Sequence, residues 1–279
     1  IKDLDTCYFP AKPVVPFIEV IHDRAVQEIF RGCIRGCRFC QAGFICRPVR
    51  EKSVDVINAQ AKATCENTGY DEISISSLST SDYTKLEPML EKMLEWTEPK
   101  HISLSLPSLR VGSIDDEIMQ RMSDLRRTGC TLAPEAGSQR LRDVINKGVT
   151  EEQVLLHVQK LLEYGWRQVK LYFMIGLPTE TDEDLRAIAD LCRKVRDAAG
   201  KGNPRLQVTA ALSPFVPKPF TPFQWEAQIT PEEYLRRVHL LQENIHSRSI
   251  DYRYHESNLS QLEAVLARGD RRLGPGLLG

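Results

Sequence analysis

The pattern of apolar and polar residues changes repeatedly along the chain between the period of a strand and the period of a helix. Short apolar runs such as EISISSL (72–78), HISLSL (101–106) and QVKLYFMI (168–175) are typical of strands buried in a parallel sheet. The predicted strands cover residues 26–30, 72–78, 101–106, 130–133, 168–175 and 206–212. Segments with helical periodicity cover residues 54–67, 83–96, 115–128, 138–146, 151–164, 182–199 and 231–246.

This alternation of strands and helices predicts an α/β fold. Strands that are each followed by a helix pair in parallel through right-handed crossovers. Six such units are fewer than the eight of a closed barrel. An open (β/α)6 partial TIM barrel and a doubly wound sheet both remain as interpretations. In both folds the functional residues lie at the carboxyl ends of the strands.

The organisation of the chain follows from the same pattern. We expect an extended, proline-punctuated lead-in at 1–23, a core at 24–247 and a C-terminal extension at 248–279. The chain has 279 residues, enough for one large α/β domain or two small ones. It starts at Ile1 and stops shortly after Pro275, so we expect it to be part of a longer chain with other domains.

Charge and hydropathy argue against obligatory nucleic-acid binding and against a membrane-spanning protein. The 37 lysines and arginines nearly balance the 38 aspartates and glutamates, which gives no indication of nucleic acid as an obligatory partner. No apolar run has the length of a membrane span, and no signal peptide opens the sequence. We therefore expect a cytoplasmic protein with no membrane partner.

The cysteines are unevenly distributed. Cys33, Cys37, Cys40 and Cys46 fall in one short stretch, whereas the other four of the eight are scattered. A disulfide framework suits shorter, secreted chains, so this clustering indicates a metal. The C-x-x-x-C-x-x-C spacing from Cys33 to Cys40 allows the thiolates to surround one iron–sulfur cluster, and three ligands leave one iron open.

Two other kinds of metal site use Cys46 as a fourth ligand. One is a structural zinc site of four thiolates, although the second C-x-x-C pair typical of such sites is missing. The other is a closed electron-transfer cluster. We prefer the open cluster, with Cys46 as a bystander.

Cys33, Cys37 and Cys40, with Phe39 directly before the third cysteine, resemble the signature of the radical S-adenosylmethionine (SAM) superfamily. The resemblance extends from about residue 26 to residue 225. It implies a partial barrel and a [4Fe-4S] cluster whose open iron is chelated by SAM. An electron from a flavodoxin- or ferredoxin-like donor would then cleave SAM, and the 5′-deoxyadenosyl radical would abstract hydrogen from an unknown substrate.

The resemblance also implies where SAM contacts the chain. Glu135 and Ser138, in PEAGS after the fourth strand, match the place of ribose contacts, and Lys147 matches that of a carboxylate contact. The alternatives are a helix N-terminal charge for Glu135 and a solvated surface lysine for Lys147. Ser76 and Ser77 end the second strand where the family has glycines that support the SAM amino group. Ser105, after the third strand, matches a position near the ribose or the substrate.

Two further segments resemble the family. GLPTET (176–181) resembles its G-x-P-x-E-T turn, with Ile175 and Gly176 as a wall of the adenine site, and is also expected to be a tight turn with a helix cap. The segment PFVPKPFTPFQW (214–225) resembles a loop at the barrel mouth of the methylthiotransferases and their uncharacterised relatives; its Lys218 is best interpreted as a surface charge.

The run 29–51 looks most like uncharacterised bacterial radical SAM proteins related to the methylthiotransferases. In those uncharacterised proteins the core often lies beside a cobalamin-type domain. Only Cys7 precedes Cys33, so the additional three-cysteine domain of a methylthiotransferase is not seen. A cluster-carrying electron-transfer module and a zinc-stabilised interaction domain are the alternatives to a SAM-cleaving enzyme.

Overall fold

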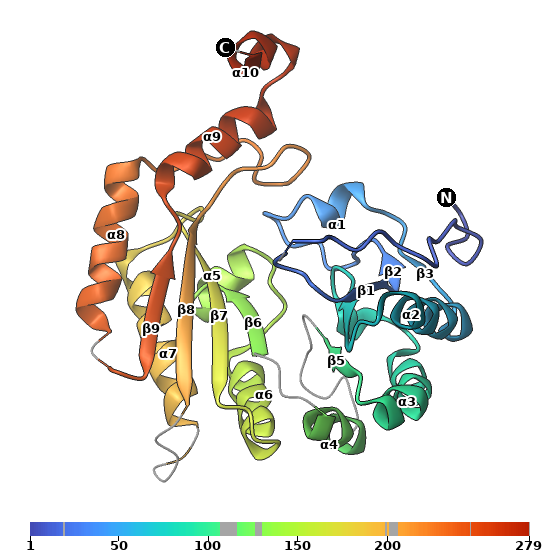
Figure 1. Cartoon of the computed structure of the whole chain (residues 1–279). Coiled ribbons are helices and arrows are strands. Elements are labelled where there is room, and N and C mark those ends of the chain that lie inside the picture. The colour runs from blue at the N-terminus through green and yellow to red at the C-terminus, as the bar shows by residue number, and fades with distance from the viewer. Residues whose placement is uncertain are drawn as a thin grey trace. The chain divides into compact units, whose positions relative to one another are not determined.

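The computed structural model describes residues 1–18, 20–106, 116–125, 130–198, 200, 206–245 and 247–278. The chain divides into two compact units, whose elements are labelled in Figure 1. The first unit comprises Ile1–Ile34, Cys46–Cys130 and Glu163–Trp166, and the second comprises Arg35–Ile45, Thr131–Leu162 and Arg167–Gly279.

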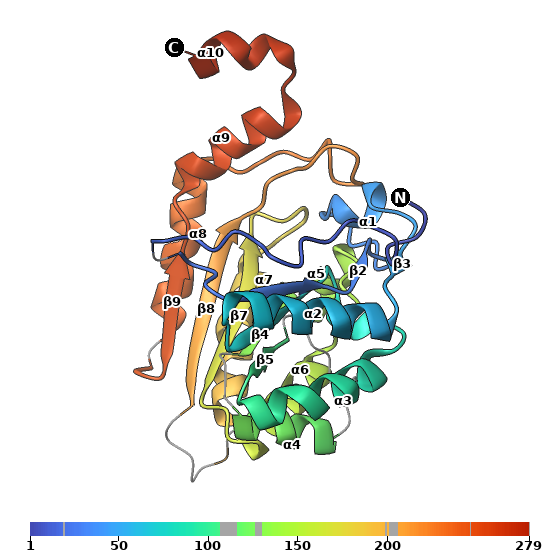
Figure 2. The ribbon, with the colours of Figure 1, turned by 45° about the vertical axis from the view of Figure 1, so that its right-hand side comes forward.

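The first unit contains a parallel sheet with the strand order β1-β4-β5 and a small antiparallel pair, β2-β3. Its strands are β1 (Ala25–Glu28), β2 (Phe30–Arg31), β3 (Arg50–Glu51), β4 (Glu72–Ser76) and β5 (Ser103–Ser105). Its helices are α2 (Val54–Thr68), α3 (Leu86–Thr97) and α4 (Asp116–Leu125), with 3₁₀ turns at Thr80–Asp82 and Glu98–Lys100. Helix α2 packs against β1 and α3, which Figure 2 shows from the side.

The second unit is built on a sheet with the strand order β6-β7-β8-β9, in which β7, β8 and β9 are parallel. Its strands are β6 (Cys130–Glu135), β7 (Gln168–Ile175), β8 (Gln207–Pro214) and β9 (Ile250–Tyr254); Cys130, the first residue of β6, belongs to the first unit. Its helices are α1 (Ala42–Ile45), α5 (Gln139–Val144), α6 (Glu151–Glu163, apart from its last residue), α7 (Asp182–Asp197), α8 (Pro231–Asn244), α9 (Ser257–Arg268) and α10 (Gly274–Leu278), with a 3₁₀ turn at Arg271–Leu273.

The predicted α/β fold with parallel strands is confirmed. All six predicted strands are present, shifted at their ends by up to two residues, while β2, β3 and β9 were not predicted. Residues 115 and 126–128 of the helix predicted at 115–128, residue 199 of the helix predicted at 182–199 and residue 246 of the helix predicted at 231–246 lie outside the described residues. Each parallel sheet keeps its strands in chain order without the reversal that defines a doubly wound sheet. This order favours the partial barrel.

Helix ends follow the sequence signals. Ser53 caps α2 by accepting a hydrogen bond from the Val56 N–H at 3.3 Å, and Gly69 ends the helix in the left-handed region. Thr230 caps α8, with Pro231 as its first residue, as predicted. These local signals explain why the elements begin and end where the pattern places them.

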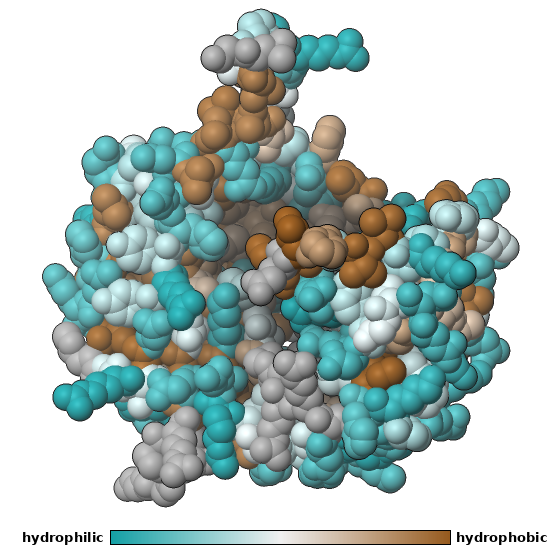
Figure 3. Space-filling model, in the orientation of Figure 1, coloured by the Kyte–Doolittle hydropathy of each residue, from teal (hydrophilic) through white to brown (hydrophobic). Residues whose placement is uncertain are grey.

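The core of the first unit is a cluster of buried apolar side chains from its sheet and helices, among them Ile29, Ile57, Ile73, Met89 and Leu90. A second cluster, in the second unit, joins α5 to the loops after β7 and β8; it consists of Ala136, Leu141, Ile145, Leu177, Phe215 and Phe223. Helix α9 exposes several leucines, and Figure 3 shows an apolar stretch over it. In the described part of the chain no helix is long and apolar enough to cross a membrane.

Candidate functional site

The three predicted ligand cysteines lie in the loop between β2 and α1, and their side chains are partly exposed and form no disulfide. Gly32 opens this loop with φ +101°, and a Cβ on it would lie 2.5 Å from the Cys46 carbonyl oxygen. Only glycine fits there, because the backbone approach leaves no room for a side chain. A tight turn therefore precedes Cys33.

Two of the cysteines outside this loop, Cys65 and Cys192, are buried. Burial raises the pKa of the Cys65 thiol to about 11 and that of Cys192 to about 12, which keeps both thiols protonated. Among the described residues no three histidine, cysteine, aspartate or glutamate side chains are grouped as around one metal ion. A donor set of three partly exposed thiols fits an iron–sulfur cluster chemically, and the ligand assignment stays a prediction.

The second half of the loop is fastened to the end of α5. The Arg38 N–H donates to the Ile145 carbonyl oxygen at 2.9 Å, and its guanidinium donates to the carbonyl oxygens of Asp143 and Val144. Asn146 donates through Nδ2 to the Gly36 carbonyl oxygen at 2.9 Å. Arg38 and Asn146 were not predicted. The signal for Asn146 is its place directly after a helix, where asparagine often adopts the left-handed conformation seen here (φ +54°).

The proline-rich loop after β8 holds the same segment from another direction. The Phe223 N–H donates to the Arg38 carbonyl oxygen at 3.3 Å, and Gln41 donates to the Pro219 carbonyl oxygen at 3.1 Å. Phe39 packs against the cluster that contains Phe223. Lys218 of this loop pairs with Glu263, consistent with the surface charge that was preferred for it.

Glu135 and Lys147, predicted to contact different groups of SAM, form an ion pair with each other at 3.1 Å. Both side chains are largely buried, at 16% and 18% exposure. Burial raises the pKa of Glu135, and the nearby Lys147 ammonium opposes this effect. Two residues chosen separately from the sequence are thus neighbours.

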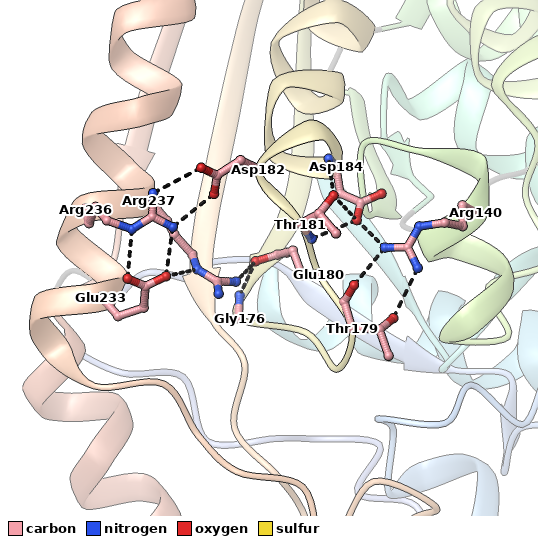
Figure 4. A network of polar contacts seen from close by, with 10 residues as sticks. All are labelled: Arg140, Gly176, Thr179, Glu180, Thr181, Asp182, Asp184, Glu233, Arg236 and Arg237. Carbon is pink, nitrogen blue, oxygen red and sulfur yellow. Dashed lines mark hydrogen bonds and ion pairs between the residues drawn. The ribbon is translucent and has the colours of Figure 1, made fainter.

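Ser138 has a structural role. Its hydroxyl oxygen accepts a hydrogen bond from the Leu141 N–H at 3.1 Å, which caps α5, and its hydroxyl donates to Asp184. Asp184 also accepts from Arg140 and completes a capping box with Thr181 at the start of α7 (Figure 4). The predicted SAM contact of Ser138 stays a prediction.

The GLPTET turn is closed by its own glutamate. Glu180 accepts a hydrogen bond from the Gly176 N–H at 2.7 Å and pairs with Arg237 of α8 at 2.6 Å (Figure 4). Burial raises the pKa of Glu180 to about 7, against the opposing effects of the Gly176 N–H and Arg237. The Glu180 contact and the Thr181 cap confirm the predicted tight turn and helix cap. The ion pair between Glu180 and Arg237, which ties this turn to α8, was not predicted.

The remaining predicted residues lie in the first unit. Ser76 ends β4, and its carbonyl oxygen accepts from the Ile29 N–H at 3.1 Å. Ser77 and Thr80 share a hydrogen bond of 2.8 Å, and Ser105 ends β5. The first unit thus carries Cys33, Ser76, Ser77 and Ser105. The second carries Cys37, Phe39, Cys40, Glu135, Ser138, Lys147, Ile175 and Gly176.

Comparison with known proteins identifies relatives along most of this chain. It is 30% identical over 88% of its length to an uncharacterised protein of Methanocaldococcus jannaschii, covering 52% of that protein. It is 26% identical over 79% of its length to the tRNA-2-methylthio-N(6)-dimethylallyladenosine synthase of Aquifex aeolicus, covering 50% of that enzyme. The chain spans about half the length of these curated relatives.

Solved structures show the same fold. The radical SAM methyltransferase TsrM of Kitasatospora setae, with cobalamin and a [4Fe-4S] cluster bound, matches with a TM-score of 0.58 and 14% identity over 72% of this chain and 38% of that one. SuiB of Streptococcus suis, bound to SAM, matches with a TM-score of 0.54 and 12% identity over 83% of this chain and 50% of that one. The predicted partial-barrel fold is confirmed by these matches.

The family itself is shown by sequence. Residues 28–192 match the family model of the Radical SAM superfamily, and this range is more than half of the chain. It includes all three predicted ligand cysteines. The chain therefore belongs to the radical SAM superfamily.

Proposed function

We propose that this enzyme cleaves SAM reductively, through a [4Fe-4S] cluster held by Cys33, Cys37 and Cys40, to produce a 5′-deoxyadenosyl radical that abstracts hydrogen from its substrate. The observation that carries the proposal is the C-x-x-x-C-x-x-C segment inside the family match, directly after the first strands. When bound, the cluster supplies one electron and an open iron for SAM. An external flavodoxin- or ferredoxin-like donor would provide that electron.

The contacts of the loop fix the backbone that carries two of the three proposed ligands, Cys37 and Cys40. Arg38 is bonded through its N–H, carbonyl oxygen and guanidinium, which fixes the backbone between Cys37 and Cys40. Phe39 adds apolar packing on the same segment. A backbone held in this way loses little conformational entropy when the thiolates bind metal.

Glu135 and Lys147 would bind the ribose and the carboxylate of SAM. Because they are paired before SAM binds, neither charge is left buried without a partner. Binding would exchange the Lys147 contact with Glu135 for one with the ligand carboxylate. The carboxylate of Glu135 would then accept hydrogen bonds from hydroxyl groups.

Ile175 and Gly176 would form an apolar wall for the adenine. The Gly176 N–H is donated to Glu180, and the Ile175 carbonyl oxygen accepts from the Phe215 N–H at 2.8 Å. With both groups engaged, the contact of this turn with adenine would be packing rather than hydrogen bonding. Ser76, Ser77 and Ser105 offer hydroxyl groups for the remaining polar contacts.

The test is anaerobic. The protein is reconstituted with iron and sulfide, reduced and mixed with SAM, and 5′-deoxyadenosine is measured by chromatography. We expect product from the wild type and from Cys46→Ala, and none from Cys37→Ala. A brown wild-type protein that yields no product would contradict SAM cleavage and favour electron transfer, and a colourless protein with zinc would favour a structural site.

A further inference from the structure

The sheet of the second unit has two faces of different character. The buried side chains of β7 are at most 1% exposed; they are Val169, Leu171, Phe173 and Ile175. The alternate residues Lys170, Tyr172 and Met174 are partly exposed. Because side chains alternate along a strand, these three share one face of the sheet, on which they are partly exposed.

Lys170 extends toward the carboxyl end of β7. Its Nζ lies 4.6 Å from the centroid of the Tyr172 ring, which is two residues further along the strand. Met174 is the next residue on this face, and it packs against the same apolar cluster as Phe39. At about 3.3 Å per residue, the Tyr172 Cα lies about 7 Å before that of Met174. The ammonium is therefore directed toward the end of the strand that carries the predicted cofactor residues.

This ammonium has no carboxylate partner. Among the described residues the Lys170 ammonium makes no hydrogen bond or ion pair, and its contact is the cation–π contact with the Tyr172 ring. Lys170 is paired with Thr209 of β8, and Thr209 is paired with Asp251 of β9. The Asp251 carboxylate is therefore one strand further away, and it forms an ion pair with Arg253 at 3.3 Å. A partly buried cation that only an aromatic ring compensates is suited to bind an anion.

The acidic side chain of the neighbouring strand is also engaged. Glu135 ends β6, and its carboxylate is paired with Lys147. It therefore leaves the Lys170 charge free for a ligand. The Tyr172 ring adds an apolar surface next to that charge, so the face combines one cation with one aromatic wall.

We propose that Lys170 and Tyr172 bind a phosphate or carboxylate group of the substrate. This inference rests on the proposed function, in which a substrate meets the radical near the cofactor end of β7. A contact between Lys170 and an anionic group of the substrate, on the same face of β7 as Met174, would fix the orientation of the substrate with respect to the cofactor end of β7.

The test measures binding, not turnover. Reconstituted protein without SAM is titrated calorimetrically with phenyl phosphate, with benzoate and with neutral benzyl alcohol. We expect saturable binding of at least one anion and none of the alcohol. Lys170→Met should weaken anion binding about tenfold, Lys170→Arg should restore most of it, and Lys62→Met, at an exposed lysine of α2, should have no effect.

Binding of phenyl phosphate alone identifies a phosphate group, and binding of benzoate alone a carboxylate. The proposal is overturned if the wild type saturates with neither anion, or if Lys170→Met binds as the wild type does. Formation of 5′-deoxyadenosine by the wild type is measured separately. Anion binding without that product refutes the proposed function and leaves the anion site standing, whereas product without anion binding refutes the site alone.

Discussion

Glu180 allows the balance between burial and ion pairing to be measured. Its side chain is 1% exposed and holds both the Gly176 N–H and Arg237. Burial raises its pKa from 4.5 to about 7, which means that burial outweighs the two contacts that favour the charged form. The perturbation that tests this balance is Glu180→Gln, which keeps the shape of the side chain and removes its titration.

The linkage between proton binding and folding gives the sign and the magnitude of the pH effect on the free energy of unfolding. The folded protein binds the Glu180 proton more tightly than the unfolded chain does. The contribution of this proton to the free energy of unfolding is therefore complete below the pKa of the unfolded chain, and it is lost as the pH rises through the pKa of the folded protein. A shift from 4.5 to about 7 corresponds to about 3 kcal/mol, at about 1.4 kcal/mol per pKa unit. Between about pH 4.5 and pH 8, Glu180→Gln should therefore gain about 3 kcal/mol in free energy of unfolding relative to wild type.

The assay is urea unfolding of both proteins over this pH range. Circular dichroism and tryptophan fluorescence are recorded together, because the chain has two compact units and the two transitions must coincide for a single free energy to apply. Glu95→Gln, which removes a carboxylate at an exposed position of α3, serves as the matched control. Parallel curves for Glu180→Gln and wild type would refute the reasoning. They would mean that Arg237 and the Gly176 N–H fully offset burial.

Three further predictions concern the site and its frame. Cys46→Ala should retain full iron content after reconstitution, and loss of iron would make Cys46 a ligand. Gly137→Ala should destabilise the protein by about 3 kcal/mol or more in chemical denaturation, because its Cβ would lie 2.2 Å from the backbone nitrogen of Ile188; a change below about 1 kcal/mol would show that α5 and α7 move apart easily. Lys147→Met should weaken SAM binding about tenfold in a direct titration, whereas unchanged affinity would remove Lys147 from the SAM contacts and leave it as the partner of Glu135.

The strands that the sequence predicted are those with strong apolar alternation, such as β7. Strand β9 was missed because its sequence IDYRY has one buried residue, Ile250, and otherwise looks like a polar connection. It is a strand because it pairs with β8 in tertiary structure, and such pairing is not encoded in local periodicity. The two-residue strands β2 and β3 are too short to carry any pattern.

Local motifs also explain what was found at the site and what was not. The cysteine spacing and the GLPTET turn are readable because their residues are adjacent in the chain. The contacts that hold them are not: Arg38 and Val144 are 106 residues apart, and Glu180 and Arg237 are 57 apart. Such pairs depend on how the strands are ordered, so a single sequence does not reveal them.

Strand β9 has a consequence for any shortened version of this protein. A chain cut after residue 247, where the sequence pattern placed the end of the core, would lose the partner that hydrogen-bonds to β8. The apolar β8 would then present a bare edge, and unpaired strand edges recruit other chains into aggregates. In the present chain the outermost strand is β9, whose exposed Asp251 and Arg253 are the kind of charged residues that discourage such pairing.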